Sequence, residues 1–145
     1  MASVLGLDGK LYRNTGSYGS PTWNEVPNVR DLTMTLEKAE ADVTTRNNSG
    51  WRANRGTLKD FTLEFMMVHD TADTDWQAFR DSFLNNTSIE VLVLDGAVGT
   101  SGSQGIRATV EVFNFTRGEE LENAMMTTVS CKPTYATNPP AWYTA

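Results

Sequence analysis

The chain has 145 residues, of which 39% are hydrophobic and 21% are charged, and its formal net charge is −6. This length fits a single domain, and the acidic balance argues against a protein that binds nucleic acid broadly through its phosphates. The single cysteine and single histidine exclude a disulfide framework and a Cys/His zinc pattern. Because the sequence shows neither a secretory signal nor an apolar run long enough to span a bilayer, we expect a soluble protein, made in a cytoplasm, with no membrane partner.

Residues 1–22 predict an N-terminal hairpin or arm. The dipeptide Asp8-Gly9 lies between apolar pairs and favours a tight turn between two strands. Residues 14–21 are rich in Gly, Ser and Tyr and predict a loop. We expect a β-sheet core over residues 23–132 and a C-terminal arm over residues 133–145, so that residues 1–145 form one domain.

The stretch from Val29 to Met67 predicts two long strands joined by a turn, because apolar and polar side chains alternate along both halves. The apolar members of the two runs are Leu32, Met34, Leu36, Phe61, Leu63, Phe65 and Met67. Little is apolar between Lys38 and Lys59. The two strands are therefore expected to reach beyond one small core and to need a partner surface there.

The loop between these two strands carries Trp51 together with Arg52 and Arg55. Exposed tryptophan beside arginine is typical of a contact surface. The same Trp51 could instead fold back on the core, and the sequence leaves both interpretations open.

Residues of about 74–85 predict a helix, since Trp76, Phe79 and Phe83 recur at spacings of three and four. The aromatic stripe of this helix is expected to pack on a sheet. The next segment, Ile89–Leu94, is apolar on both faces and predicts a central strand.

The last two predicted strands cover Ile106–Arg117 and Leu121–Lys132. On the first of them, strict alternation places Val112 on one face and both Phe113 and Phe115 on the other. The tail beyond these strands holds two adjacent prolines followed by Trp142 and Tyr143. It predicts either an arm that docks on a neighbouring molecule or a frayed terminus.

No combination of side chains indicates a catalytic or metal site. His69 is expected at the surface or near a helix cap, and Cys131 as a small buried residue on a strand. Asp70, Asp73 and Asp75 lack the glycine and the distal glutamate of a calcium loop, and a helix N-terminus explains their charge. We therefore expect no enzymatic activity, metal or cofactor.

The residues 29–36 (VRDLTMTL), 42–46 (DVTTR) and 50–51 (GW) form a pattern that resembles the major tail tube proteins of long-tailed, siphovirus-type bacteriophages. The order of the later elements agrees, including the helix and the strand that ends before Asp95-Gly96. The resemblance covers about Trp23 to Lys132.

This resemblance implies a mainly β fold, a β-sandwich or barrel with one flanking α-helix, whose strands join an inter-subunit β-barrel in a ring. Such subunits form hexameric rings that stack into a tube, and a long hairpin typically reaches the next ring. It also implies a virion protein assembled in the host cytoplasm. Its partners would be further copies of itself, the tape measure protein, and the tail tip and terminator proteins, with DNA passing through the lumen without specific binding.

Within that picture two sets of residues are assigned from the pattern of charge and alternation. The expected contacts between subunits and rings are Lys38, Glu40, Asp42, Arg46, Trp51, Arg52, Arg55 and Trp142. The expected lumen-facing residues are Thr62, Glu64, Glu90, Thr109, Glu111 and Thr128. The lumen assignment requires Glu64 and Glu111 to lie on the same face of the subunit.

Two other interpretations remain at this stage. The chain could form the tube of a contractile tail or of an injection or secretion system, which differ mainly in what surrounds the tube. It could instead be a monomeric β-sandwich that binds a ligand, which would require the aromatic residues to gather in one cleft. The four tryptophans are scattered along the sequence, which favours the first group.

Overall fold

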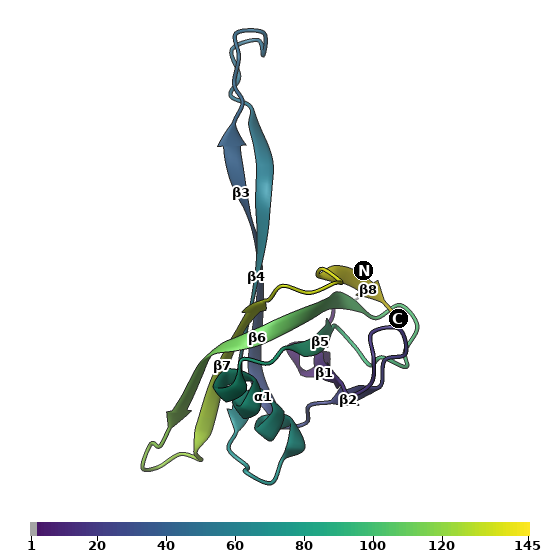
Figure 1. The fold of residues 1–145 in the computed structure, drawn as a ribbon, viewed down its shortest axis with the longest axis vertical. Coiled ribbons are helices and arrows are strands. Elements are labelled where there is room, and N and C mark those ends of the chain that lie inside the picture. The colour runs from purple at the N-terminus through teal and green to yellow at the C-terminus, as the bar shows by residue number, and fades with distance from the viewer. Residues whose placement is uncertain (1–2) are drawn as a thin grey trace.

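The computed structural model describes residues 3–145 and contains one eight-stranded antiparallel sheet with a single α-helix beside it (Figure 1). The strand order is β2-β1-β5-β6-β7-β4-β3, and β8 pairs with β6 outside this path. A short 3-10 turn, η1 (Gly6–Asp8), precedes the first strand, and α1 covers Thr74–Asn85. The strands are β1 (Lys10–Asn14), β2 (Trp23–Glu25), β3 (Val29–Asp42), β4 (Asn54–Val68), β5 (Ile89–Leu94), β6 (Gln104–Gly118), β7 (Met126–Pro133) and β8 (Ala141–Thr144). The prediction of a mainly β fold with one flanking helix is confirmed.

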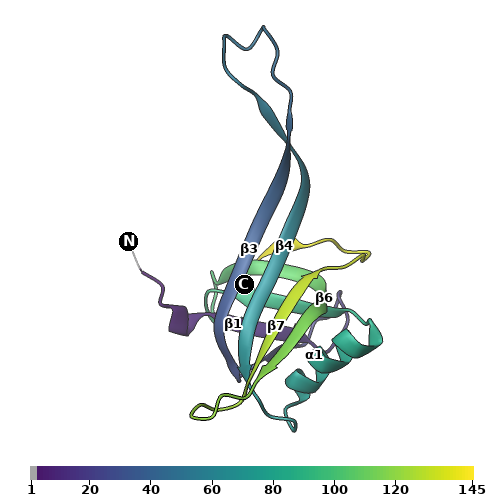
Figure 2. The same cartoon turned by 90° about the vertical axis from the view of Figure 1, so that its left-hand side faces the viewer.

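Strand β6 connects the two halves of the sheet. Its first part pairs with β5 and β8, and its second part pairs with β7. The sheet curls about this strand, so that β3 and β4 pass across β1 (Figure 2). Buried side chains from both halves, including Leu11, Phe65 and Val93, form one core cluster between them.

The alternation of β4 sets one wall of this core. Phe61, Leu63, Phe65 and Met67 are at most 2% exposed, whereas Glu64 is exposed. Strand β4 pairs with β3 and β7 through its two edges, and its apolar face packs into the core cluster that also holds Leu11, Phe79 and Val93. The prediction of an alternating strand at this position is confirmed.

Helix α1 closes one side of the core (Figure 2). Its N-terminus is capped by Asp73, whose carboxylate accepts a hydrogen bond from the Asp75 amide at 3.0 Å. Phe79 is fully buried edge-on against Phe65, with 5.1 Å between the ring centroids. The indole of Trp76 donates a hydrogen bond to the Thr127 hydroxyl, so this buried ring has its polar group satisfied.

A β-bulge corrects the predicted face of Phe115. The pairing of β6 with β7 shifts between Val112 and Asn114, so Phe113 is the extra residue. The shift returns Phe115 to the core side, where it packs edge-on against Trp76, while Phe113 stays 56% exposed. Strict alternation therefore assigned Phe115 to the wrong face.

The predicted hairpin at Asp8-Gly9 is also wrong. Asp8 and Gly9 donate backbone hydrogen bonds to the carbonyls of Leu5 and Gly6, which produces the 3-10 turn η1. The hairpin forms later, between β1 and β2, and its loop is the Gly/Ser-rich segment 15–22. Residues 1–2 lie outside the described part of the chain. None of the helices within residues 3–145 combines the length and apolar character needed to cross a membrane.

We expect Phe79→Ala to lower the free energy of unfolding by about 3–5 kcal/mol, because it removes the aromatic contact that fixes α1 on the sheet. Phe83→Ala is the matched control on the same helix, since Phe83 is already 43% exposed, and its effect should be about 1 kcal/mol or less. Chemical denaturation followed by circular dichroism measures both. Equal losses for the two variants would contradict this assignment of the helix face.

Burial raises the pKa of the Cys131 thiol from 9.0 to about 12. The native thiol should therefore resist an aromatic disulfide reagent at pH 8 and react once the protein is denatured. The folded state holds the thiol proton more tightly than the unfolded state, so this residue's contribution to stability should fall as the pH rises from 9.0 to about 12. The free energy of unfolding of the Cys131→Ala variant should not show this decrease between pH 9.0 and about 12. Rapid labelling of the native protein would contradict the buried placement.

Candidate functional site

The largest feature that the core does not explain is an arm formed by residues 37–60, which projects from the body as a two-stranded ribbon (Figure 1). Strand β4 pairs with β7 only from Leu63 to Val68, so beyond Phe61 its one partner is β3. A two-stranded ribbon standing alone is marginally stable in water. The change from the eight-stranded sheet to the ribbon coincides with the start, after Leu36, of a stretch that contains few apolar residues.

Cross-strand charges make the base of the arm unfavourable by itself. Glu37 faces Asp60, and Lys38 faces Lys59, so two pairs of like charges lie directly opposite each other. Only Asp60 has an ion-pair partner in the described chain, Lys132 at 3.8 Å. An arm with this pattern gains stability from opposite charges brought by another molecule.

The arm tip, residues 43–53, is nevertheless an ordered turn. Trp51 donates its amide to the Asn48 carbonyl, and the Asn48 side chain donates back to the Trp51 carbonyl, both at 2.9 Å. Ser49 and Gly50 adopt positive φ angles, which such a tight reversal requires. Just below the tip, hydrogen bonds from the Thr44 hydroxyl and amide lower the pKa of the Asp42 carboxyl.

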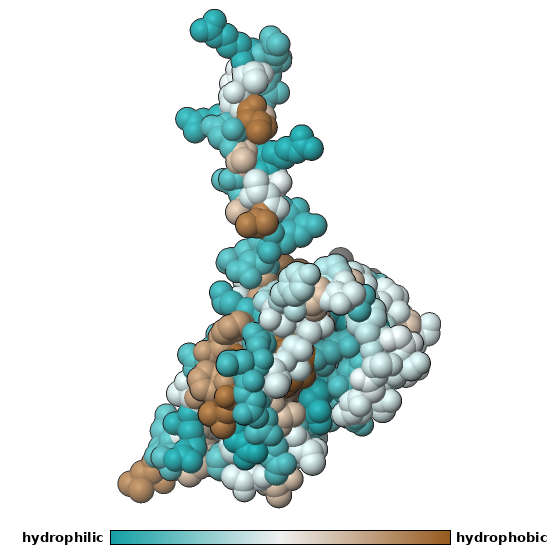
Figure 3. Space-filling model, in the orientation of Figure 1, coloured by the Kyte–Doolittle hydropathy of each residue, from teal (hydrophilic) through white to brown (hydrophobic). Residues whose placement is uncertain are grey.

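The predicted contact residues gather on this arm. Those on the arm are Lys38, Glu40, Asp42, Arg46, Trp51, Arg52 and Arg55, and all are exposed. The Trp51 ring is 76% exposed, so it does not fold back on the core. Figure 3 shows the arm as a mainly hydrophilic column with isolated hydrophobic side chains.

Trp142 lies apart from the arm, because the C-terminal residues are part of the subunit's own sheet. Strand β8 places Trp142 opposite Ile106, and its indole donates a hydrogen bond to Gln104. The neighbouring Tyr143 packs edge-on against Trp23. Trp142 is still 59% exposed, so the terminus is ordered while this side chain stays accessible.

The predicted lumen residues share a polar face of the sheet. Glu64 lies opposite Ser130 on β7, and two residues further along that strand Lys132 lies opposite Glu111 on β6. Directly opposed residues leave the same face of a sheet, so Glu64 and Glu111 lie on one face. By the same register, Thr62 and Thr128 belong to this face, and so does Thr109, two residues before Glu111.

Glu90 is on the same side but is covered. Its carboxylate forms an ion pair with Arg107 and accepts a hydrogen bond from Asn14 at 2.9 Å. The Arg107 guanidinium also donates to the Tyr18 carbonyl and lies 3.7 Å from the centre of the Tyr18 ring. The loop 15–22 is therefore fixed over this end of the sheet. The Glu90 side chain is consequently less exposed to solvent than the alternation predicted.

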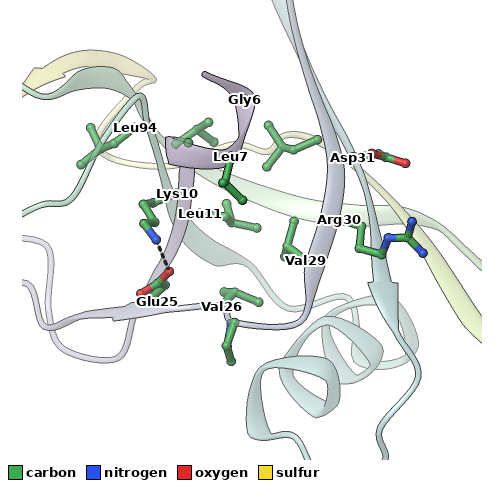
Figure 4. A pocket seen from close by; sticks show the side chains of 14 residues that line it. Gly6, Leu7, Lys10, Leu11, Glu25, Val26, Val29, Arg30, Asp31 and Leu94 are labelled. Carbon is green, nitrogen blue, oxygen red and sulfur yellow. Dashed lines mark ion pairs between the residues drawn. The ribbon is translucent and has the colours of Figure 1, made fainter. Parts of the chain in front are cut away.

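Both ends of the sheet path are free. Among residues 3–145, neither β3 nor β2 has a strand on its outer edge. Near the free edge of β3 lies a groove of about 870 Å³, which β1, η1 and the segment before β3 also line. In Figure 4, Leu7, Leu11 and Val29 point into this groove, and the ion pair of Lys10 with Glu25 lies at its rim. The groove lining mixes apolar side chains with the charged residues Lys10, Glu25, Arg30 and Asp31, and the unpaired edge of β3 beside it is open to pairing with a further strand.

The described residues hold no group of three or more His, Cys, Asp or Glu side chains that could bind a metal ion. His69 stacks edge-on against Trp76 and lies 3.5 Å from the Thr127 hydroxyl, so it packs beside the helix. Asp73 and Asp75 are engaged in capping α1, in a bond from Asn28, and in an ion pair with Arg13. These contacts account for the titratable residues that the sequence singled out.

The geometry defines a class of protein: within residues 3–145, one curled eight-stranded antiparallel sheet with a flanking helix, a projecting ribbon, two free sheet edges and a polar sheet face. No family model and no curated protein sequence matches the chain. A chain in the tail of an empty gene transfer agent particle, determined with C6 symmetry, is similar with a TM-score of 0.73 and 16% identity, over 99% of each chain. The tail tube of SPP1 is similar with a TM-score of 0.71 and 12% identity, over 90% of this chain and 76% of that one.

A baseplate structure contains a similar chain as well. A chain from the baseplate of the anti-feeding prophage matches with a TM-score of 0.65 and 8% identity, over 99% of this chain and 97% of that chain. At these identities the likeness is one of fold. The chain thus has the fold found in the SPP1 tail tube, and the resemblance drawn from the sequence is confirmed at that level.

We expect Arg107→Lys to loosen the loop 15–22, because lysine lacks the planar fork that bonds Glu90 and Tyr18 while stacking on the Tyr18 ring. Hydrogen exchange of residues 15–22 should become faster, while exchange in β4 and β7 stays unchanged. Arg117→Lys is the control, since the Arg117 side chain is 55% exposed and pairs only with Glu119 at 3.7 Å. Unchanged exchange in the Arg107 variant would show that the loop is held by other contacts.

Proposed function

We propose that this protein is the structural subunit of a tail tube and that copies of it assemble into stacked rings, most simply hexameric. The arm carries this proposal, because a two-stranded ribbon with like-charged cross-strand pairs and an exposed tryptophan would gain stability from contact with further subunits. The fold shared with the SPP1 tail tube and with the C6-symmetric gene transfer agent tail supports it.

In this proposal the free edges of β2 and β3 join the sheets of adjacent subunits around the ring. A continuous barrel removes edges that would otherwise pair without control. The contact is heterologous, since two different surfaces of the same subunit meet, and a closed ring is one outcome of such a contact. The arm residues Lys38, Glu40, Asp42, Arg46, Trp51, Arg52 and Arg55 then serve contacts between rings, with Trp142 at an edge of the body.

The polar sheet face would line the lumen. Its hydroxyl and carboxylate side chains include Thr62, Glu64, Thr109, Glu111 and Thr128. A wet, weakly acidic wall repels phosphate and lets DNA pass without binding. We propose that the tape measure protein occupies this lumen before DNA does, that tail tip and terminator proteins close the two ends of the tube, and that the subunit has no enzymatic role.

The tube of a contractile system is the alternative, supported by the similarity to a chain in the extended sheath-tube complex of a contractile injection system, with a TM-score of 0.63. The two proposals share the ring and the lumen. They differ in whether a sheath protein binds the outer surface of the tube.

Negative-stain electron microscopy of the purified protein over a range of concentrations, paired with light scattering, tests the assembly. We expect rings or hollow tubes of uniform diameter, because free edges and the arm need neighbours. Protein that remains monomeric, and that also fails to extend purified tail tips, would contradict the proposal and favour a monomeric ligand-binding module.

A further inference from the structure

The arm tip carries positive charge only. Residues 43–53 contain Arg46 and Arg52 and no carboxylate, and neither arginine forms an ion pair within residues 3–145. Between these arginines the Trp51 ring is 76% exposed. The tip is a preformed basic and aromatic contact surface, which loses little conformational entropy on binding.

The turn between β6 and β7, residues 119–125, has the opposite character. It contains Glu119, Glu120 and Glu122 and no basic residue. Arg117 at its base neutralises part of this charge through its 3.7 Å contact with Glu119. Leu121 projects from the middle of the turn and is fully exposed, which is unusual for a large aliphatic side chain at the end of a hairpin.

The two surfaces lie at opposite ends of the molecule. In Figure 1, where the longest axis is vertical, the arm tip is at the top and the turn between β6 and β7 is at the bottom. A chain therefore cannot join its own tip to its own turn. A second copy displaced along this axis can, and the contact repeats without closing, which is the geometry of a growing stack.

From these observations we infer that the arm tip of one copy docks on the β6–β7 turn of a copy in the adjacent ring, with Trp51 against Leu121 and the tip arginines against Glu120 and Glu122. The inference rests on the proposed function and names the receiving surface for the arm. Asp75 and Asp73 at the start of α1 are already engaged, since Asp75 pairs with Arg13 and Asp73 caps the helix. Within the turn, Glu120 accepts a hydrogen bond from the Asn123 side chain, and neither Glu120 nor Glu122 has an ion-pair partner among the described residues.

A charge exchange tests this docking. Arg46→Glu with Arg52→Glu, and separately Glu120→Arg with Glu122→Arg, should each raise the concentration needed for tube formation by about tenfold or more, since each places like charges together. The variant with all four changes restores opposite charges and should recover most of that loss. Sedimentation and electron microscopy report assembly, and unchanged thermal unfolding confirms that these exposed sites leave the fold intact.

Asp81→Arg is the control, because it reverses a charge on α1, outside both the arm tip and the β6–β7 turn, where the Asp81 side chain is 50% exposed and pairs with its neighbour Arg80. It should leave assembly within about twofold of the unmodified protein. A fourfold variant that assembles no better than either double variant would overturn the docking while the tube function stands. Failure of the unmodified protein to form rings or tubes, even on tail tips, would instead overturn the proposed function itself.

Discussion

The structure depends on one constraint, which is that β3 and β4 are longer than the core they enclose. Where the two strands lie in the body, their facing side chains pair apolar groups, such as Leu32 with Phe65 and Leu36 with Phe61. Beyond Phe61 no third strand follows, and the first two facing pairs, Glu37 with Asp60 and Lys38 with Lys59, are charged and of like sign. Burial stabilises the first half of the ribbon, whereas the second half has almost no area to bury within its own chain.

The rest of the fold gives the ribbon a firm base. Helix α1 presses Phe79 onto Phe65 in β4, the strand that continues into the arm. On the other half of the sheet, Arg107 fixes the loop 15–22 through Glu90 and Tyr18. Side-chain contacts thus hold the body in one arrangement. The groups that are still free to contact neighbouring molecules are the backbone edges of the sheet and the exposed charged side chains.

The sequence was sufficient to predict what depends on local periodicity. Alternation located β4 and its buried face, and the three- and four-residue spacing of Trp76, Phe79 and Phe83 located the helix. The polar stretch after Lys38 predicted strands that leave the core. The sequence did not predict the face of a side chain where one extra residue interrupts the alternation. The bulge at Phe113 turns Phe115 inward, and nothing in the local pattern marks such an insertion, because the register is set by pairing with β7.

The same limit of local sequence patterns applies to the C-terminus and to the candidate contact surfaces. Trp142 was assigned to an arm, but a four-residue strand pairs the tail with β6, a contact between residues about 40 positions apart that no short window contains. The exposure of Trp51 could not be decided from its neighbours either. The sequence alone shows that the arm tip is basic and that the β6–β7 turn is acidic. Only the structure shows that these two segments lie at opposite ends of the molecule.

The unbroken course of β4 also has a mechanical consequence. The strand runs from the end of the arm into the sheet of the body, where it is hydrogen-bonded to the edge strand β3 on one side and to β7 on the other. Its hydrogen bonds are perpendicular to the strand direction. Tension applied along the arm therefore shears many of these bonds at once and does not open them one after another. Load carried by the arm is therefore distributed across the sheet of the body.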